Sequence, residues 1–119
     1  MGIFSIVFSI FLSVILIGGG YLCKSAANGG INDYVGYRTK LSKKNADTWK
    51  EGNTYGGRVL IICGLAYAII STVCSMIFYN QALIILIGVS LGVIPVILIG
   101  VYISEKHLKN IFDSEGNRK

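Results

Sequence analysis

Charged residues are scarce in this chain and missing from most of its length. Asp, Glu, Lys and Arg make up 14% of the 119 residues, whereas 53% are hydrophobic. All of these charges lie within residues 24–58 and 105–119. A charged side chain inside a bilayer is expensive and is kept mainly for transport or proton relay, so the uncharged stretches argue against a proton-coupled pump. The composition as a whole is typical of an integral membrane protein.

Catalytic and metal-binding patterns are missing as well. No Cys-x-x-Cys spacing connects the three cysteines, which are Cys23, Cys63 and Cys74. The only histidine, His107, follows the last apolar stretch, and we interpret it as a solvated side chain at the membrane interface. Asp33 and Asp47 are the aspartates of the central loop, and their spacing does not form an acid–base pair. We therefore expect no enzymatic activity, no metal site and no cofactor.

Three apolar stretches are long enough to cross a bilayer as helices. A hydrocarbon core of about 30 Å requires about 20 apolar residues, because every backbone polar group must be satisfied within the segment. Residues 3–22, 59–79 and 82–104 meet this requirement. No Lys or Arg precedes the first stretch, which favours an uncleaved span over a secretory signal. The predicted fold is an all-α polytopic membrane protein of one domain, residues 1–119, with a loop at 24–58 and a tail at 105–119.

The basic residues predict the orientation of the chain. Lys and Arg accumulate in short cytoplasmic loops, and here they lie only in the central loop and the tail. We therefore predict an extracellular N-terminus, a cytoplasmic loop and a cytoplasmic C-terminus. The net charge of +5 then faces the inner leaflet, where anionic lipids attract basic groups. Membrane lipids are the expected partner, and direct nucleic-acid binding is not needed to explain the charge.

Small residues suggest how the spans pack. The second and third spans are joined by Asn80 and Gln81 alone, which predicts an antiparallel helical hairpin. Stripes of small residues mark faces where helices approach closely, either within one chain or in a homo-oligomer. The stripes are Ser5, Ser9 and Ser13, then Gly64, Ala68, Ser71 and Ser75, and then the GxxxG of Gly88 and Gly92. Pro95 is expected to kink the third span.

The central loop carries more information than a simple connector requires. Ser42 or Asn45 can cap a helix that runs directly into the second span. On that helix Asn45, Trp49, Asn53 and Gly56 share one face, because they are spaced by four, four and three residues. The charged residues around them point elsewhere, so an amphipathic juxtamembrane helix is predicted. Trp49 suits the membrane interface, having an apolar body and a polar N–H.

The loop pattern resembles the SdpI family of bacterial membrane proteins. The residues that carry the resemblance, and that we predict to form the functional motif, are Asn32, Gly36, Tyr37, Arg38, Thr39, Ser42, Asn45, Trp49, Asn53 and Gly56. The pattern covers about twenty-five residues between the first two spans, where this family carries it. In the family a Pro commonly follows the Gly-Tyr-Arg-Thr and an Ala precedes the second Asn, whereas this chain has Lys40 and Gly52 there. The chain looks like the core of the family alone.

The resemblance implies a function in the bacterial cytoplasmic membrane. It implies immunity to a secreted peptide or protein toxin, with a signalling role in which a cytoplasmic transcriptional repressor is held at the membrane. Arg38 either binds a carboxylate, phosphate or lipid headgroup beside Tyr37 and Trp49, or bonds loop carbonyls or Asp47. Two other classes stay open: a small oligomeric transporter or channel, favoured by Gly88, Gly92 and Pro95, and a weaker alternative, a membrane enzyme acting on lipid or peptide.

The predicted orientation can be tested by cysteine labelling. In a background lacking the three native cysteines, Lys43→Cys should be protected from a membrane-impermeant maleimide in intact cells, because position 43 lies in the cytoplasmic loop. Asn80→Cys, in the short turn, should be labelled under the same conditions. Labelling of position 43 from outside would contradict the orientation.

Overall fold

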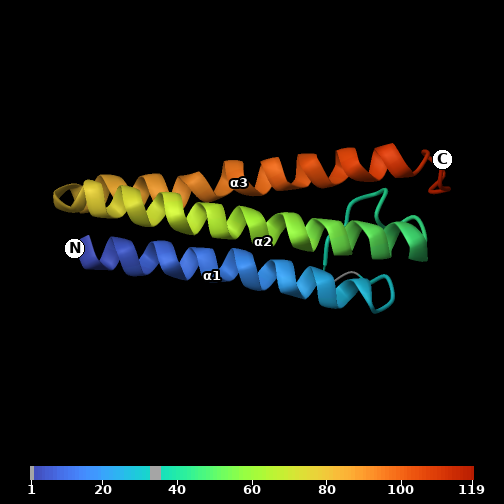
Figure 1. Cartoon of the computed structure of the whole chain (residues 1–119), viewed down its shortest axis with the longest axis horizontal. Helices are drawn as coiled ribbons and strands as arrows, with labels where there is room; N and C mark the ends of the chain where they lie inside the picture. The colour runs from blue at the N-terminus through green and yellow to red at the C-terminus, as the bar shows by residue number, and fades with distance from the viewer. Residues whose placement is uncertain (1, 33–35) are drawn as a thin grey trace.

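Three long helices form the protein. The computed structural model describes residues 2–32 and 36–119, in which α1 (Gly2–Ala27), α2 (Ala46–Ile77) and α3 (Ala82–Ile111) are joined by the loop and by the short 3-10 helix η1 (Tyr79–Gln81). The helices lie side by side in Figure 1, each antiparallel to the next in sequence. The N-terminus shares one end of the bundle with η1, and the loop and C-terminus share the other. The all-α polytopic fold is confirmed, while Asp33 lies outside the described residues.

The helices are longer than the membrane is thick. The molecule measures 53 Å along its longest axis, and the 32 residues of α2 span about 48 Å at 1.5 Å per residue. Because the hydrocarbon core takes only about 30 Å of this length, the charged end of the bundle extends beyond it. The juxtamembrane helix and the second span are one continuous helix, as the sequence predicted. The first helix continues past the predicted span to Ala27.

The closest helix contact joins α1 to α2 at glycines. A Cβ added to Gly57 would lie 2.6 Å from the carbonyl oxygen of Gly20, and one added to Gly20 would lie 2.7 Å from that of Gly57. Farther along α2, a Cβ on Gly64 would lie 2.8 Å from Cγ1 of Ile17. Only glycine allows such an approach of two backbones. Gly64 was predicted as a contact, whereas Gly20 and Gly57 were not.

The predicted serine stripe also lies between α1 and α2. Ser5, Ser9 and Ser13 are all buried, and the hydroxyls of Ser9 and Ser75 lie 3.2 Å apart in a hydrogen bond between the helices. The Ser9 and Ser13 hydroxyls also donate to the carbonyls of Ser5 and Ser9, at 2.8 and 2.7 Å. These bonds satisfy the hydroxyls where water is absent, so the stripe packs within one chain.

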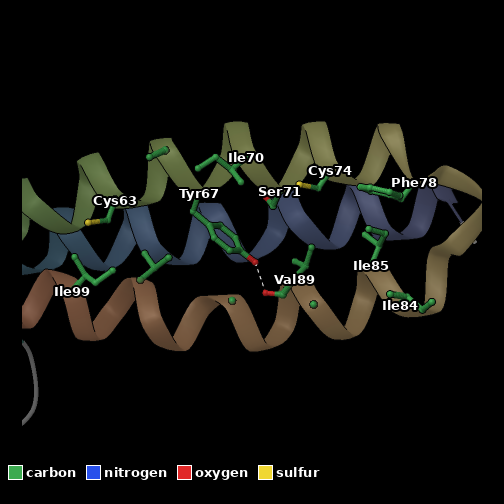
Figure 2. Close-up of a pocket in the computed structure, with 14 residues that line it drawn as sticks. Cys63, Tyr67, Ile70, Ser71, Cys74, Phe78, Ile84, Ile85, Val89 and Ile99 are labelled. Carbon is green, nitrogen blue, oxygen red and sulfur yellow. Dashed lines mark hydrogen bonds between the residues drawn. The ribbon is translucent and has the colours of Figure 1, made fainter.

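The third helix packs more loosely. Leu16, Tyr67 and Val89 supply one buried side chain from each helix, and the Tyr67 hydroxyl donates to the Val89 carbonyl at 2.7 Å (Figure 2). Around Tyr67 a largely apolar cleft of about 500 Å³ separates α2 from α3. A Cβ on Gly88 would meet no atom within 4 Å, so the GxxxG stripe makes no close contact among the described residues. The third helix continues through Pro95 without a break.

The glycine contact predicts a sharp contrast between two alanine substitutions. Gly57→Ala should lower the free energy of unfolding by about 1–3 kcal/mol, because its Cβ must push the Gly20 backbone away. Gly88→Ala, in open space, should be neutral or slightly stabilising. Unfolding of the purified protein in detergent micelles, followed by circular dichroism, measures both. Equal losses for the two variants would contradict the packing described.

Candidate functional site

The predicted motif residues gather at the loop end of the bundle. The central residue is Asn53 of α2, whose side chain is fully buried. Its Oδ1 accepts a hydrogen bond from the backbone N–H of Tyr37 at 2.6 Å, and its Nδ2 donates to the carbonyls of Tyr37 and Trp49 at 3.3 and 3.0 Å. One amide thus satisfies both backbone groups of a loop residue. This bonding fixes the loop against α2.

Gly36 explains why the loop can reach Asn53. Its φ is +114°, a conformation that residues with a Cβ rarely adopt. A Cβ at this position would also collide with Oδ1 of Asn53 and would lie 3.0 Å from Cβ of Ala26. The glycine of the Gly-Tyr-Arg-Thr sequence is therefore required by both backbone conformation and space.

A tight turn follows the Gly-Tyr-Arg-Thr sequence. The buried hydroxyl of Ser42 accepts from the backbone N–H of Thr39 at 2.8 Å and lies within bonding distance of two carbonyls, those of Tyr37 and Thr39. The Thr39 hydroxyl in return accepts from the Ser42 N–H at 3.2 Å. Hydroxyl side chains that bond the local backbone in this way stabilise turns. The turn holds the basic side chain of Lys40 at the surface.

Glu105 of α3 completes the cluster, and sequence reasoning missed it. Its Oε1 accepts hydrogen bonds from the hydroxyls of Tyr37, at 2.6 Å, and Thr39. Burial, together with the adjacent Glu105 carboxylate, raises the pKa of the Tyr37 phenol far above its ordinary value, so the phenol stays protonated. One feature of the sequence could have pointed to Glu105, because it is the first charged residue after the third span.

The Tyr37 ring lies against two glycines of α2. A Cβ on Gly52 would be 3.4 Å from Cδ1 of Tyr37 and 3.1 Å from Cβ of Ser42, and a Cβ on Gly56 would be 3.3 Å from Cγ of Tyr37. Both contacts are tight enough that a methyl group would displace a neighbour. The family pattern commonly has Ala at position 52. In this chain Gly52 leaves the space that the Tyr37 ring and Ser42 occupy.

Trp49 is buried inside the protein, whereas the sequence predicted a side chain facing the membrane interface. Its side chain is only 1% exposed, and its indole N–H donates to the carbonyl of Ala26 at 2.8 Å. That carbonyl is one of the groups that the end of α1 leaves without a helical partner. Trp49 thus ties the end of α1 to the start of α2 and cannot stack beside Arg38 in a shared binding surface.

Asn45 is the N-cap of α2. The sequence predicted either Ser42 or Asn45 for this position. Its side chain accepts from the Thr48 N–H at 2.9 Å, and the Thr48 hydroxyl accepts from the Asn45 N–H at 3.0 Å. The same side chain donates to the carbonyl of Gly116 at 2.8 Å. The N-cap therefore also holds the C-terminal tail, a contact that local sequence patterns do not reveal.

The tail is also held by an ion pair. Arg118 makes a bidentate contact with Asp47, both bonds measuring 2.8 Å, and its guanidinium lies 5.0 Å from the ring centre of Phe112. The hydrogen bonds from Arg118 lower the pKa of Asp47, which also lies in the favourable first turn of α2. Asp47 is thus engaged by Arg118 and does not bond Arg38.

His107 is half-buried and held by partners rather than freely solvated, which corrects part of the sequence interpretation. Its Nε2 lies 2.8 Å from Oε1 of Glu51, and its ring stacks on that of Tyr55 with 3.6 Å between the ring centres. The residues lie on α2 and α3, so the stack joins the two helices beyond the predicted spans. Sequence spacing could not pair them, because 56 residues separate Glu51 from His107.

Arg38 and Asn32 differ from the other motif residues. Arg38 is exposed and bonds to no other side chain in the part of the chain that the structure describes. The Asn32 amide donates to the nearby carbonyl of Gly30 at 3.3 Å. Within residues 2–32 and 36–119 no buried side-chain polar atom lacks a partner, and no cluster suits a metal ion. The arrangement is a frame of hydrogen-bonded side chains that presents Arg38 outward, and we call it the loop frame.

The match to known proteins covers the described part of the motif loop, α2 and most of α3, and it ends before Glu105. Residues 30–102 match the model of the SdpI/YfhL protein family, which is more than half of the chain. The chain belongs to this family. It is 31% identical over 67 residues to the "Immunity protein SdpI" of Bacillus subtilis (strain 168), a stretch that makes up 56% of this chain. The match spans 30% of that SdpI protein's length, and no solved structure matches this SdpI-family chain.

The hydrogen bonds of Asn53 predict that this asparagine stabilises the loop of the SdpI-family chain, whereas an exposed asparagine does not. Asn53→Ala should lower the free energy of unfolding by about 1–3 kcal/mol, because the N–H and carbonyl of Tyr37 lose their buried partner. Asn110→Ala, at an exposed position of α3, should change it by less than about 0.5 kcal/mol. Thermal unfolding in detergent micelles compares the two variants. If Asn53→Ala is as mild as Asn110→Ala, the loop is not held as described.

Proposed function

We propose that this chain is a non-enzymatic membrane immunity protein that protects its host from a membrane-active peptide or protein toxin. The observation that carries the proposal is the family match over residues 30–102, which includes the loop from Gly36 to Asn45, all of α2 and most of α3. The name of the B. subtilis relative supports the same class of function. Among the described residues every buried side-chain polar atom is hydrogen-bonded, which suits a fixed surface for binding a partner.

The proposed location is the bacterial cytoplasmic membrane, with the N-terminus outside and the loop and C-terminus inside. The distribution of Lys and Arg supports this orientation. The geometry is compatible with it, because all the basic residues lie toward the end of the bundle that carries the loop and the C-terminus. The spans hold the loop frame at the inner leaflet.

Arg38 is the proposed binding residue of the loop. Its guanidinium carries five donors in a fixed fork that suits a carboxylate or phosphate. It directly follows Tyr37, whose two backbone groups are fixed by Asn53, so little backbone freedom is lost when a partner binds. In the proposed signalling role, this surface would hold a cytoplasmic transcriptional repressor at the membrane.

Gene deletion and a pair of matched arginine variants test the immunity function. Cells lacking the gene should become sensitive to the secreted toxin of a producing strain, and the intact gene should restore resistance. Arg38→Gln should lose most of this protection while its level in the membrane stays unchanged. Arg58→Gln, an exposed arginine of α2 outside the motif, should protect fully. Unchanged sensitivity of the deletion strain would reject immunity, whereas equal protection by the two variants would reject only the role of Arg38.

A small oligomeric transporter or channel is the second candidate. The observation that favours it is the cleft between α2 and α3, where Gly88 and Gly92 stay open to a second helix. If this candidate holds, ion or solute flux in reconstituted vesicles should fall when Gly88 and Gly92 are replaced by Leu. Absence of flux from the unmodified protein under every imposed gradient would reject it.

A further inference from the structure

A second cleft lies at the charged end of the bundle, outside the loop frame. Its volume is about 700 Å³, and it is bordered by the turn after Thr39, the end of α3 and the C-terminal tail. Four lysines line it, together with the apolar side chains of two further residues: Lys40, Lys44, Lys109, Lys119, Leu41 and Phe112. We call this feature the basic cleft. It joins the turn of the central loop to the end of α3 and the tail that follows it, which are about 60 residues or more away in the sequence.

The lysines of the basic cleft are not neutralised by the protein. In residues 2–32 and 36–119 the basic side chains within salt-bridge distance of a carboxylate are His107, beside Glu51, and Arg118, beside Asp47, so none of the four lysines has a carboxylate partner. Two carboxylates also line the cleft, and both accept other hydrogen bonds. Glu105 accepts from Tyr37 and Thr39, and Asp113 accepts from the backbone N–H groups of Glu115 and Asn117. Even with both carboxylates charged, four lysines against two carboxylates leave the cleft with a net positive charge.

The tail that forms one wall of the basic cleft is folded. The backbone N–H of Asp113 bonds the Asn117 carbonyl, and that of Lys119 bonds the Ile111 carbonyl, both at 2.9 Å. These bonds hold Phe112 and Arg118 opposite each other in an antiparallel bridge. The backbone of Lys119 is thus held at the cleft.

The depth of the basic cleft matches the lipid headgroups. Lys109 lies five residues beyond Ser104, the predicted end of the third span, which is about 7–8 Å along the helix. The polar layer of a bilayer extends about 5–7.5 Å beyond the hydrocarbon core on each side, so Lys109 lies at its outer edge, where a flexible lysine side chain can reach back to the headgroups. Half-buried Leu41 gives the cleft an apolar part that suits the lipid backbone, whereas Phe112 lies behind the cleft wall and is only 1% exposed. A soluble anion would gain nothing from this depth or this apolar part.

We propose that the basic cleft binds the phosphate headgroup of an anionic phospholipid such as phosphatidylglycerol. Lysines are point charges on flexible stems, which suit a headgroup held by several ammonium groups rather than by one bidentate fork. The proposal goes beyond the immunity function and does not depend on it, because the lysines of the cleft are separate from Arg38. Anionic lipid would then link the loop, α3 and the tail.

Native mass spectrometry of the full-length protein tests the proposal with two matched double variants. The first, Lys40→Gln with Lys109→Gln, removes two cleft lysines. The second, Lys43→Gln with Lys106→Gln, removes the same charge from neighbouring exposed positions that do not line the cleft. In titrations with POPG, the first pair should weaken the tightest binding event at least tenfold, and the second less than twofold. POPC binding should be equal in all forms.

Three outcomes would overturn the proposal. Equal loss of POPG binding in both double variants would show a diffuse charge effect without a defined site. Displacement of POPG by millimolar inorganic phosphate would assign the cleft to a soluble anion. Tight binding of an acidic peptide to the protein in POPC nanodiscs, lost in the first pair alone, would assign it to a protein partner. Unchanged unfolding temperatures in both variants control for damage to the fold.

Discussion

The Asn53 side chain, which is fully buried, supplies both a donor and an acceptor to the backbone of Tyr37. A buried amide or carbonyl without a partner is costly, so this pairing decides where the loop lies. The positive φ of Gly36 brings the chain to Asn53, and the Tyr37 ring then rests on the glycine face of α2 with its hydroxyl on Glu105. The loop is thereby part of the bundle, in contact with α2 and α3.

Two kinds of interaction hold the molecule together, and each suits its surroundings. Within the spans, small residues let α1 and α2 approach, since lipid gives no hydrophobic drive for helices to associate. Beyond the spans, side-chain hydrogen bonds, the Asp47–Arg118 pair and the His107–Tyr55 stack take over. The spans themselves contain no charged side chain. The proposed binding surfaces lie on the polar, hydrogen-bonded end of the bundle beyond them.

Patterns of neighbouring residues predicted much of this arrangement. Hydropathy identified three spans, the Asn45 cap located the start of α2, and the spacing of Trp49, Asn53 and Gly56 identified the face that is buried. Contacts between distant residues escaped prediction, as with Glu105 or the tail contact of Asn45, because no local spacing encodes them. Trp49 was misplaced for a related reason: its amphipathic chemistry suits a membrane interface and an internal helix end equally well.

The central claim is that the loop is docked on α2 through Asn53, and amide hydrogen exchange of Tyr37 tests it most directly. In the unmodified protein reconstituted in nanodiscs, the Tyr37 N–H should exchange at least a hundredfold more slowly than the N–H of exposed Gly30 in the same loop. Exchange of Tyr37 at the rate of Gly30 would mean that the loop is not docked and would contradict the account.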